Sequence, residues 1–159
     1  MQGVVVTTET GFAMQFEVPM AHAPERVWAA ITEPGLLTLW LADAEIEPVA
    51  DGRFVLRFWN TGSVMTGRVL EYAPPQVFAF RWSSEDAQDS EVRWEVAPAP
   101  AGCRLRLTHT LCEAETLPVM LAGWHTHLEM LAIALEGGRP AWPWTRWEEL
   151  RDQYKASLA

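Results

Sequence analysis

Hydrophobic residues alternate with polar or small residues in several short segments of the chain, with the period of two that is typical of β-strands. In the first of these segments Phe12, Met14 and Phe16 share one face, because successive side chains of a strand point to opposite sides of the sheet. Turn signals such as Asp51-Gly52 separate the later segments. We therefore expect strands over residues 12–19, 42–48, 53–59, 63–72, 76–82, 90–97 and 103–111.

Two short helices are predicted between the first and second strands. Pro24 suits the first turn of a helix, where the N–H that proline lacks has no helical partner. Pro34 disfavours helical geometry in the residue before it, so the first helix should end by Glu33. Residues 35–40 leave room for one or two further turns, which place Trp40 at the end of the second helix.

A long helix and a terminal helix follow the last predicted strand. The long helix has Pro118 in its first turn and Gly137-Gly138 just after its end, which are residues that favour a helix start and a helix stop. Its roughly 19 residues would span about 28 Å, enough to cross a whole sheet. Residues 144–157 are predicted to form a short terminal helix.

Together these elements predict an α+β architecture, in which a curved antiparallel sheet of six to seven strands packs its apolar face against the long helix. The other face of the sheet is charged, as expected for an antiparallel sheet with one side in water. We expect one domain over 1–159, with a core over 12–137 and a Trp-rich C-terminal extension over 138–159. The space between sheet and helix would then be partly core and partly cavity.

The charge of the chain argues against two kinds of partner. The sequence has 12 Lys and Arg against 21 Asp and Glu, a net charge of −9, and its basic residues form no cluster. We therefore expect neither a nucleic acid nor an anionic membrane surface as a partner. Cys103 and Cys112 lack a metal or redox spacing, and the N-terminus lacks a signal-peptide pattern, so we expect a cytoplasmic protein with reduced thiols.

Several segments, taken in order, resemble a known fold. They are PERVWAAITEPGLLTLW, DGRFVLRFW, GRVLEYAPPQVFAFRW, VRWEV, LRLTHTL and AGWHTHLEMLAIALEGGRP. Between residues 12 and 150 the chain resembles the helix-grip fold of the START-like, Bet v 1-like superfamily. Within that superfamily it is similar to bacterial proteins related to the activator of the 90-kDa heat-shock chaperone's ATPase. The resemblance implies a cavity under the long helix, but members differ in activity, so it does not fix a function.

The chain has nine tryptophans, and large aromatic side chains both fill cores and line apolar pockets. Either role fits each of the candidates on inward faces or near element ends. These candidate ligand-binding residues are Trp40, Trp59, Met65, Trp82, Trp94 and Trp124. By contrast, Trp142, Trp144 and Trp147 are expected to hold the C-terminal extension on the body or to form a dimer contact.

Two histidines complete the candidate set. His109 lies on the apolar face of the last strand, and His127 lies on the face of the long helix that points to the sheet. Each fits a hydrogen-bonded core histidine or a group that orients a ligand. His125 and His127 point about 200° apart on a helix and cannot share one metal ion, so we expect no metal site and no cofactor, with His125 at the surface or the helix–sheet edge.

Three functions remain open from the sequence. The first is non-enzymatic binding of a small apolar or aromatic molecule between sheet and helix. The second is a cyclase- or hydrolase-like enzyme that uses His109 or His127 as acid or base. The third is a protein-interaction module, such as a chaperone regulator or a homodimer built on the Trp-rich extension.

Overall fold

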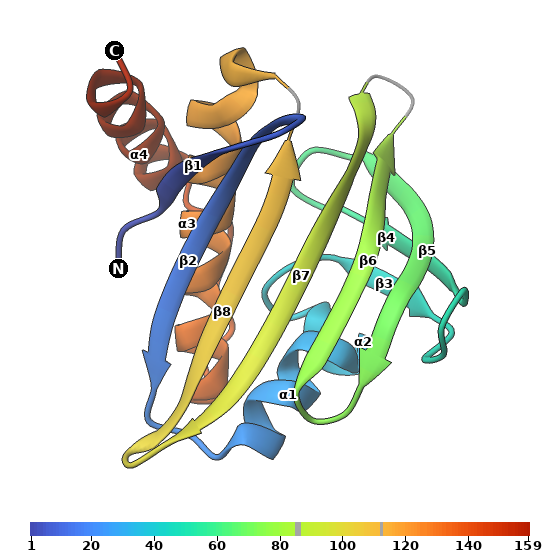
Figure 1. The fold of residues 1–159 in the computed structure, drawn as a ribbon. Helices are drawn as coiled ribbons and strands as arrows, with labels where there is room; N and C mark the ends of the chain where they lie inside the picture. Colours follow the sequence, from blue (N-terminus) through green and yellow to red (C-terminus); the bar gives the residue numbers. More distant parts are fainter. Residues whose placement is uncertain (85–86, 112) are drawn as a thin grey trace.

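Eight antiparallel strands form one sheet in the computed structural model, which describes residues 1–84, 87–111 and 113–159 (Figure 1). The strand order is β1-β2-β8-β7-β6-β5-β4-β3. The strands are β1 (Val4–Thr8), β2 (Gly11–Met20), β3 (Asp43–Ile46), β4 (Arg53–Arg57), β5 (Val64–Ala73), β6 (Val77–Ser84), β7 (Ala87–Ala99) and β8 (Gly102–Leu111). This arrangement confirms the predicted α+β helix-grip architecture and adds one strand to it.

The additional strand is β1, which pairs with β2 at the edge of the sheet. Its sequence, VVVTT, does not alternate between apolar and polar residues. Three of its five residues are exposed to solvent, because it lies outside the layer that α3 covers. Periodicity therefore carries no signal for this strand.

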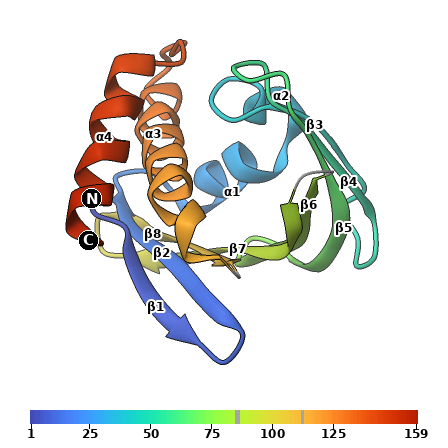
Figure 2. The same ribbon diagram turned by 90° about the horizontal axis from the view of Figure 1, so that it is seen from above.

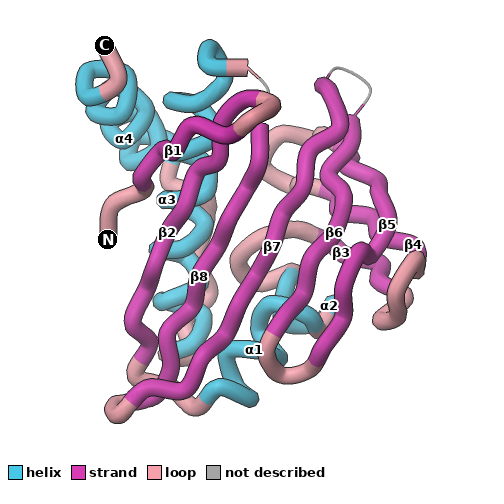
Figure 3. Tube along the Cα trace, in the orientation of Figure 1, coloured by secondary structure: helices cyan, strands magenta, loops and turns pink. Residues whose placement is uncertain are grey.

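The helices lie on the inner side of the sheet (Figure 2). They are α1 (Pro24–Thr32), α2 (Pro34–Leu37), the short 3-10 helix η1 (Ala114–Thr116), α3 (Leu117–Leu135) and α4 (Trp144–Ser157). The sheet curls around α3 and α1, while α4 packs along the outer side of α3 (Figures 2 and 3). Within the described part of the chain, none of these helices has both the length and the hydrophobicity needed to span a bilayer.

The core lies between the concave face of the sheet and α3. The strand register brings apolar residues of the same face into line, so that Leu107 of β8 pairs with Phe16 of β2 and with Trp94 of β7. All three side chains are buried. Burial of these apolar side chains stabilises the layer by about 25 cal/mol for each Å² of apolar surface removed from water.

The break between α1 and α2 places Trp40 in that core. Pro34 ends α1 and starts α2, as its restricted geometry requires. Trp40 follows α2, is 0 % exposed, and donates a hydrogen bond of 2.9 Å from its indole Nε1 to the carbonyl oxygen of Ala30. The two short helices therefore act as one unit that closes one end of the core.

Charged side chains occupy the convex face of the sheet. Arg57 pairs with Glu45 at 2.9 Å, and Arg106 pairs with Glu17 at 2.9 Å. These pairs are about half exposed, so each contributes little to stability. The concave face is therefore the side of the sheet on which an apolar site can form.

Candidate functional site

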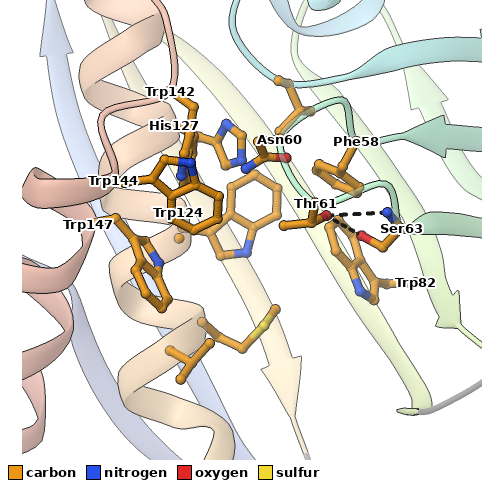
Figure 4. A pocket seen from close by; sticks show the side chains of 14 residues that line it. Phe58, Asn60, Thr61, Ser63, Trp82, Trp124, His127, Trp142, Trp144 and Trp147 are labelled. Atoms are coloured by element: carbon orange, nitrogen blue, oxygen red, sulfur yellow. Dashed lines mark hydrogen bonds between the residues drawn. The ribbon is translucent and has the colours of Figure 1, made fainter.

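A cavity of about 270 Å³ opens between α3 and the sheet. Its walls come from β6, the β4–β5 loop, α3, the linker between α3 and α4, and the first turn of α4 (Figure 4). The lining residues are Leu41, Phe58, Asn60, Thr61, Ser63, Trp82, Val119, Met120, Gly123, Trp124, His127, Trp142, Trp144 and Trp147. None of these side chains carries a full charge near neutral pH. Nine of the fourteen are aromatic or aliphatic, as is typical of sites for apolar ligands.

Three of the predicted candidates line the cavity directly: Trp82, Trp124 and His127. The rings of Trp82 and Trp124 are 5.6 Å apart, centroid to centroid, and tilted by 58°. Trp82 also packs against Phe58 at 5.7 Å. These contacts form a continuous aromatic wall from β6 to α3, and each ring pair adds about 0.5–1.5 kcal/mol beyond its buried area.

Four other candidates do not line the cavity. Trp40 and Trp94 are fully buried behind its wall, where their rings meet edge to face at 6.1 Å. Met65 is also buried, opposite Leu56 in the β4–β5 pair. Trp59 is 44 % exposed and does not line the cavity.

His109, the remaining candidate, lies beneath the cavity wall and is 0 % exposed. Its Nδ1 accepts a hydrogen bond of 3.0 Å from the indole N–H of Trp124. Its Nε2 must then carry the proton, and it donates to the Ser90 hydroxyl at 2.8 Å. Burial lowers the pKa of His109 to about 3, so the ring is neutral. His109 therefore holds the Trp124 ring in place from the side of the core, opposite the cavity.

His127 presents one nitrogen toward the cavity. Its Nδ1 lies 2.9 Å from the carbonyl oxygen of Trp40, and since a carbonyl oxygen only accepts, Nδ1 carries the proton. Burial lowers the pKa of His127 to about 4, so the imidazole is neutral and Nε2 is an acceptor. Nε2 has no hydrogen-bond partner among the described residues.

Sequence reasoning assigned Trp142, Trp144 and Trp147 to the anchoring of the C-terminal extension, but the structure also places all three in the cavity wall. Trp142 packs against His127, with ring centroids 4.7 Å apart and the planes tilted by 47°. Trp144 meets Trp142 at 5.8 Å and Trp147 at 5.9 Å, both nearly edge to face. The sequence signal for this part of the wall was the presence of three tryptophans within six residues. No neighbouring residue in the sequence indicated that the linker folds back over α3.

Two buried polar atoms of the described chain have no hydrogen-bond partner: Oδ1 of Asn60 and Nε1 of Trp142. Both residues line the cavity. An unpaired buried polar group costs about 1–3 kcal/mol, and such groups are rare in folded proteins. By contrast, the Thr61 and Ser63 hydroxyls bond to each other at 2.7 Å (Figure 4).

His125 does not face solvent, so that part of the expectation was wrong, although its ring meets the ring of Phe16 of β2 at 5.9 Å. It is 5 % exposed and its Nδ1 lies 2.7 Å from the Tyr154 hydroxyl, because α4 covers this side of α3. Burial lowers the pKa of His125, although Glu129 nearby opposes the shift. A terminal helix over 144–157 was predicted, but not that it covers this side of α3.

The described part of the chain has neither a cluster of metal-ligating side chains nor an exposed cysteine. Within residues 1–84, 87–111 and 113–159, no three His, Cys, Asp or Glu side chains gather in a way that could hold a metal ion. Cys103 is a buried free cysteine, and burial raises the pKa of its thiol. Cys112, the other predicted thiol, lies outside the described residues.

Known structures share this fold. CalU16 from Micromonospora echinospora aligns over 98 % of this chain and 96 % of its own, with a TM-score of 0.80 and 21 % identity. The protein BPP1335 from Bordetella parapertussis aligns over 98 % and 94 %, with a TM-score of 0.72 and 26 % identity. MLL2253 from Mesorhizobium loti aligns over 78 % and 96 %, with a TM-score of 0.71 and 25 % identity.

No curated protein sequence matches the chain. The family model of the Activator of Hsp90 ATPase homolog 1-like proteins matches residues 21–136, from the start of α1 to the end of α3. That range contains most of the strands and the long helix between which the cavity lies. With its helix-grip sheet, its long α3 and this match over more than half of its length, the chain belongs to the Activator of Hsp90 ATPase homolog 1-like family.

Proposed function

We propose that this protein binds a small apolar or aromatic molecule in the cavity between the sheet and α3. The observation that carries the proposal is an uncharged cavity of about 270 Å³ with five tryptophans in its wall. Ligand pockets of about 300–1,000 Å³ accept drug-sized molecules. A cavity of about 270 Å³ lies just below that range and fits a ligand of about two fused rings.

Binding rather than catalysis accounts best for the histidines. An acid–base catalyst works best when its pKa lies near the working pH. The pKa values of about 4 for His127 and about 3 for His109 keep both rings neutral at pH 7. Among the residues that the structure describes, no carboxylate, lysine or cysteine lines the cavity to act with them.

A glycine in the wall offers a clean test of the site. Gly123 of α3 lines the cavity, and a Cβ added there meets no atom within 4 Å. Gly123→Leu should therefore fill the cavity without displacing the core. We expect the neutral dye N-phenyl-1-naphthylamine to bind the wild-type protein with a rise in fluorescence, and to bind the variant at least about tenfold more weakly.

Gly35→Leu is the matched control, since Gly35 also lies in a helix with open space around its Cβ but not at this cavity. It should bind the dye as the wild-type protein does. Equal dye binding by Gly123→Leu and the wild-type protein would place the dye elsewhere and refute the proposal. Native mass spectrometry of gently purified protein, beside a denatured sample, then gives the mass of the natural ligand.

A further inference from the structure

We infer that the cavity selects a neutral aromatic molecule that carries a hydroxyl group, with the hydroxyl bound between the linker tryptophan Trp142 and the acceptor atoms of His127 and Asn60. The inference rests on the proposed function and names the chemical class of its ligand. It is carried by two buried polar atoms without partners among the described residues, Oδ1 of Asn60 and Nε1 of Trp142, and by His127, whose Nδ1 is bonded to the Trp40 carbonyl. The other polar side chains of the wall, Thr61 and Ser63, bond to each other.

His127 and Asn60 each provide an acceptor atom. Nε2 of His127 holds a lone pair, since the bond from Nδ1 to the Trp40 carbonyl keeps the only ring proton on the other nitrogen. Oδ1 of Asn60, from the β4–β5 loop, is buried and unpaired. A ligand that satisfies either atom must supply an O–H or N–H donor.

The third atom is a donor. Nε1 of Trp142 can only donate, and it has no acceptor among the described residues. The Trp142 ring lies 4.7 Å from the ring of His127, so the donor and one acceptor belong to neighbouring side chains of the wall. A hydroxyl oxygen is the smallest group that both donates to an acceptor and accepts from a neighbouring N–H.

The surroundings select against an ionised group. No Lys or Arg of the described residues lines the cavity. A ligand carboxylate bound there would lose its hydration without gaining a cation as partner. A carboxylate also has no proton to give to His127 Nε2 or Asn60 Oδ1. An aromatic body, in turn, packs against Trp82 and Trp124 on the wall below.

Three probes of the same ring size test this chemistry: 2-naphthol, naphthalene and 2-naphthoate, titrated into the wild-type protein by calorimetry at pH 7. We expect 2-naphthol to bind at least about tenfold more tightly than naphthalene, because naphthalene would leave the buried polar atoms unpaired. This order reverses the one that hydrophobicity alone would produce. The anion 2-naphthoate should bind most weakly.

A spectroscopic measurement locates the hydroxyl. In a ¹⁵N-correlated spectrum of the indole N–H groups, the Trp142 signal, assigned by its loss in Trp142→Phe, should move downfield with 2-naphthol and not with naphthalene. Trp142→Phe keeps the aromatic ring and removes the donor. This substitution should lower the affinity for 2-naphthol by about three- to tenfold and leave the affinity for naphthalene unchanged.

Trp59→Phe is the control substitution, because Trp59 is exposed and does not line the cavity. It should change the affinity for neither probe. If naphthalene or 2-naphthoate binds as tightly as 2-naphthol, the inference is overturned while the proposed function stands. If none of the three probes binds, both are overturned.

Discussion

At the scale of single residues, His109 joins the cavity wall to the sheet beneath it. The imidazole accepts from the Trp124 indole N–H and donates to the Ser90 hydroxyl, which lies within 3.5 Å of the Trp82 carbonyl oxygen. This series of hydrogen bonds links Trp124 to Trp82, the two tryptophans that face each other across the cavity floor. His109 therefore contributes to binding through the orientation of Trp124, although it does not line the cavity.

Replacement of His109 by Leu should destabilise the protein. The Trp124 N–H would lose its only acceptor and the Ser90 hydroxyl would lose a donor, both in the core. Since one unpaired buried group costs about 1–3 kcal/mol, we expect the free energy of unfolding to fall by about 2–4 kcal/mol. Urea denaturation measures it. His109→Gln, which keeps one donor and one acceptor, should recover part of the loss, and a His109→Leu variant as stable as wild type would contradict this role.

At the scale of elements, α4 and the linker before it complete the cavity. Arg146 of α4 makes two hydrogen bonds to the Glu129 carboxylate of α3, at 2.7 and 3.1 Å. Tyr154 accepts a hydrogen bond of 2.9 Å from the backbone N–H of Gly3, and its hydroxyl also contacts His125. These contacts hold α4, and with it Trp144 and Trp147, against α3. Deletion of residues 141–159 would therefore remove part of the cavity as well as any partner surface.

The Tyr154 hydroxyl offers a test of this attachment. Tyr154→Phe keeps the ring but leaves the Gly3 N–H and the His125 Nδ1 without their partner. We expect a loss of about 1–3 kcal/mol in the free energy of unfolding and faster amide hydrogen exchange in α4.

Tyr72→Phe is the matched control, because Tyr72 is the only other tyrosine of the chain and packs through its ring against Trp28 and Phe78. No hydrogen bond joins its hydroxyl to a described residue, so its removal should cost little. If Tyr72→Phe proved as destabilising as Tyr154→Phe, the hydroxyl contacts of Tyr154 would not be what holds α4 in place.

At the scale of the whole molecule, the sheet and helices keep three histidines out of water. His109, His125 and His127 are all buried, on three sides of the core: the last strand, the α4 side of α3, and the cavity. Burial lowers the pKa of each below 6.5, to about 3 for His109 and about 4 for His127. The packing of the fold thus makes its stability depend on pH.

The sign of this dependence follows from proton binding. The unfolded chain takes up protons at these histidines near pH 6.5, whereas the folded protein does not, so the unfolded state binds more protons below pH 6.5. The histidine contribution is complete above about pH 6.5 and is lost as the pH falls toward the folded pKa values. We expect the free energy of unfolding to drop between pH 6.5 and 5, by up to about 1.4 kcal/mol per pH unit for each histidine.

Urea denaturation at pH 7.0, 6.0 and 5.0 measures this slope. In His109→Gln the slope should be smaller than in the wild-type protein, because one of the three titrating groups is gone. A stability that does not change over this range would show that the histidines are protonated in the folded protein, and so are not buried as described.

Most of the fold was predictable because local signals determine it. The alternation of Phe12, Met14 and Phe16 marks β2, and Pro24 starts α1 as expected. The second helix, expected over 35–40, is Pro34–Leu37, so Trp40 follows it. The edge strand β1 escaped prediction, since a short run of valines on an exposed edge has no period. The cavity was predicted in its location, but only Trp82, Trp124 and His127 of the candidates line it.

The sequence by itself determined the helices and every strand except β1, because these depend on periodicity and on proline geometry within a few residues. Only the tertiary structure decided which inward side chains meet a cavity and which meet each other. Trp82 and Trp94 both lie at inward positions of strands with an alternating pattern. Trp94 is nevertheless covered by Trp40, whereas Trp82 is not fully buried. Trp142 reaches His127 because the linker after α3 folds back over that helix. Contacts between residues distant in sequence, such as the bond from Gly3 to Tyr154, hold the α4 that follows.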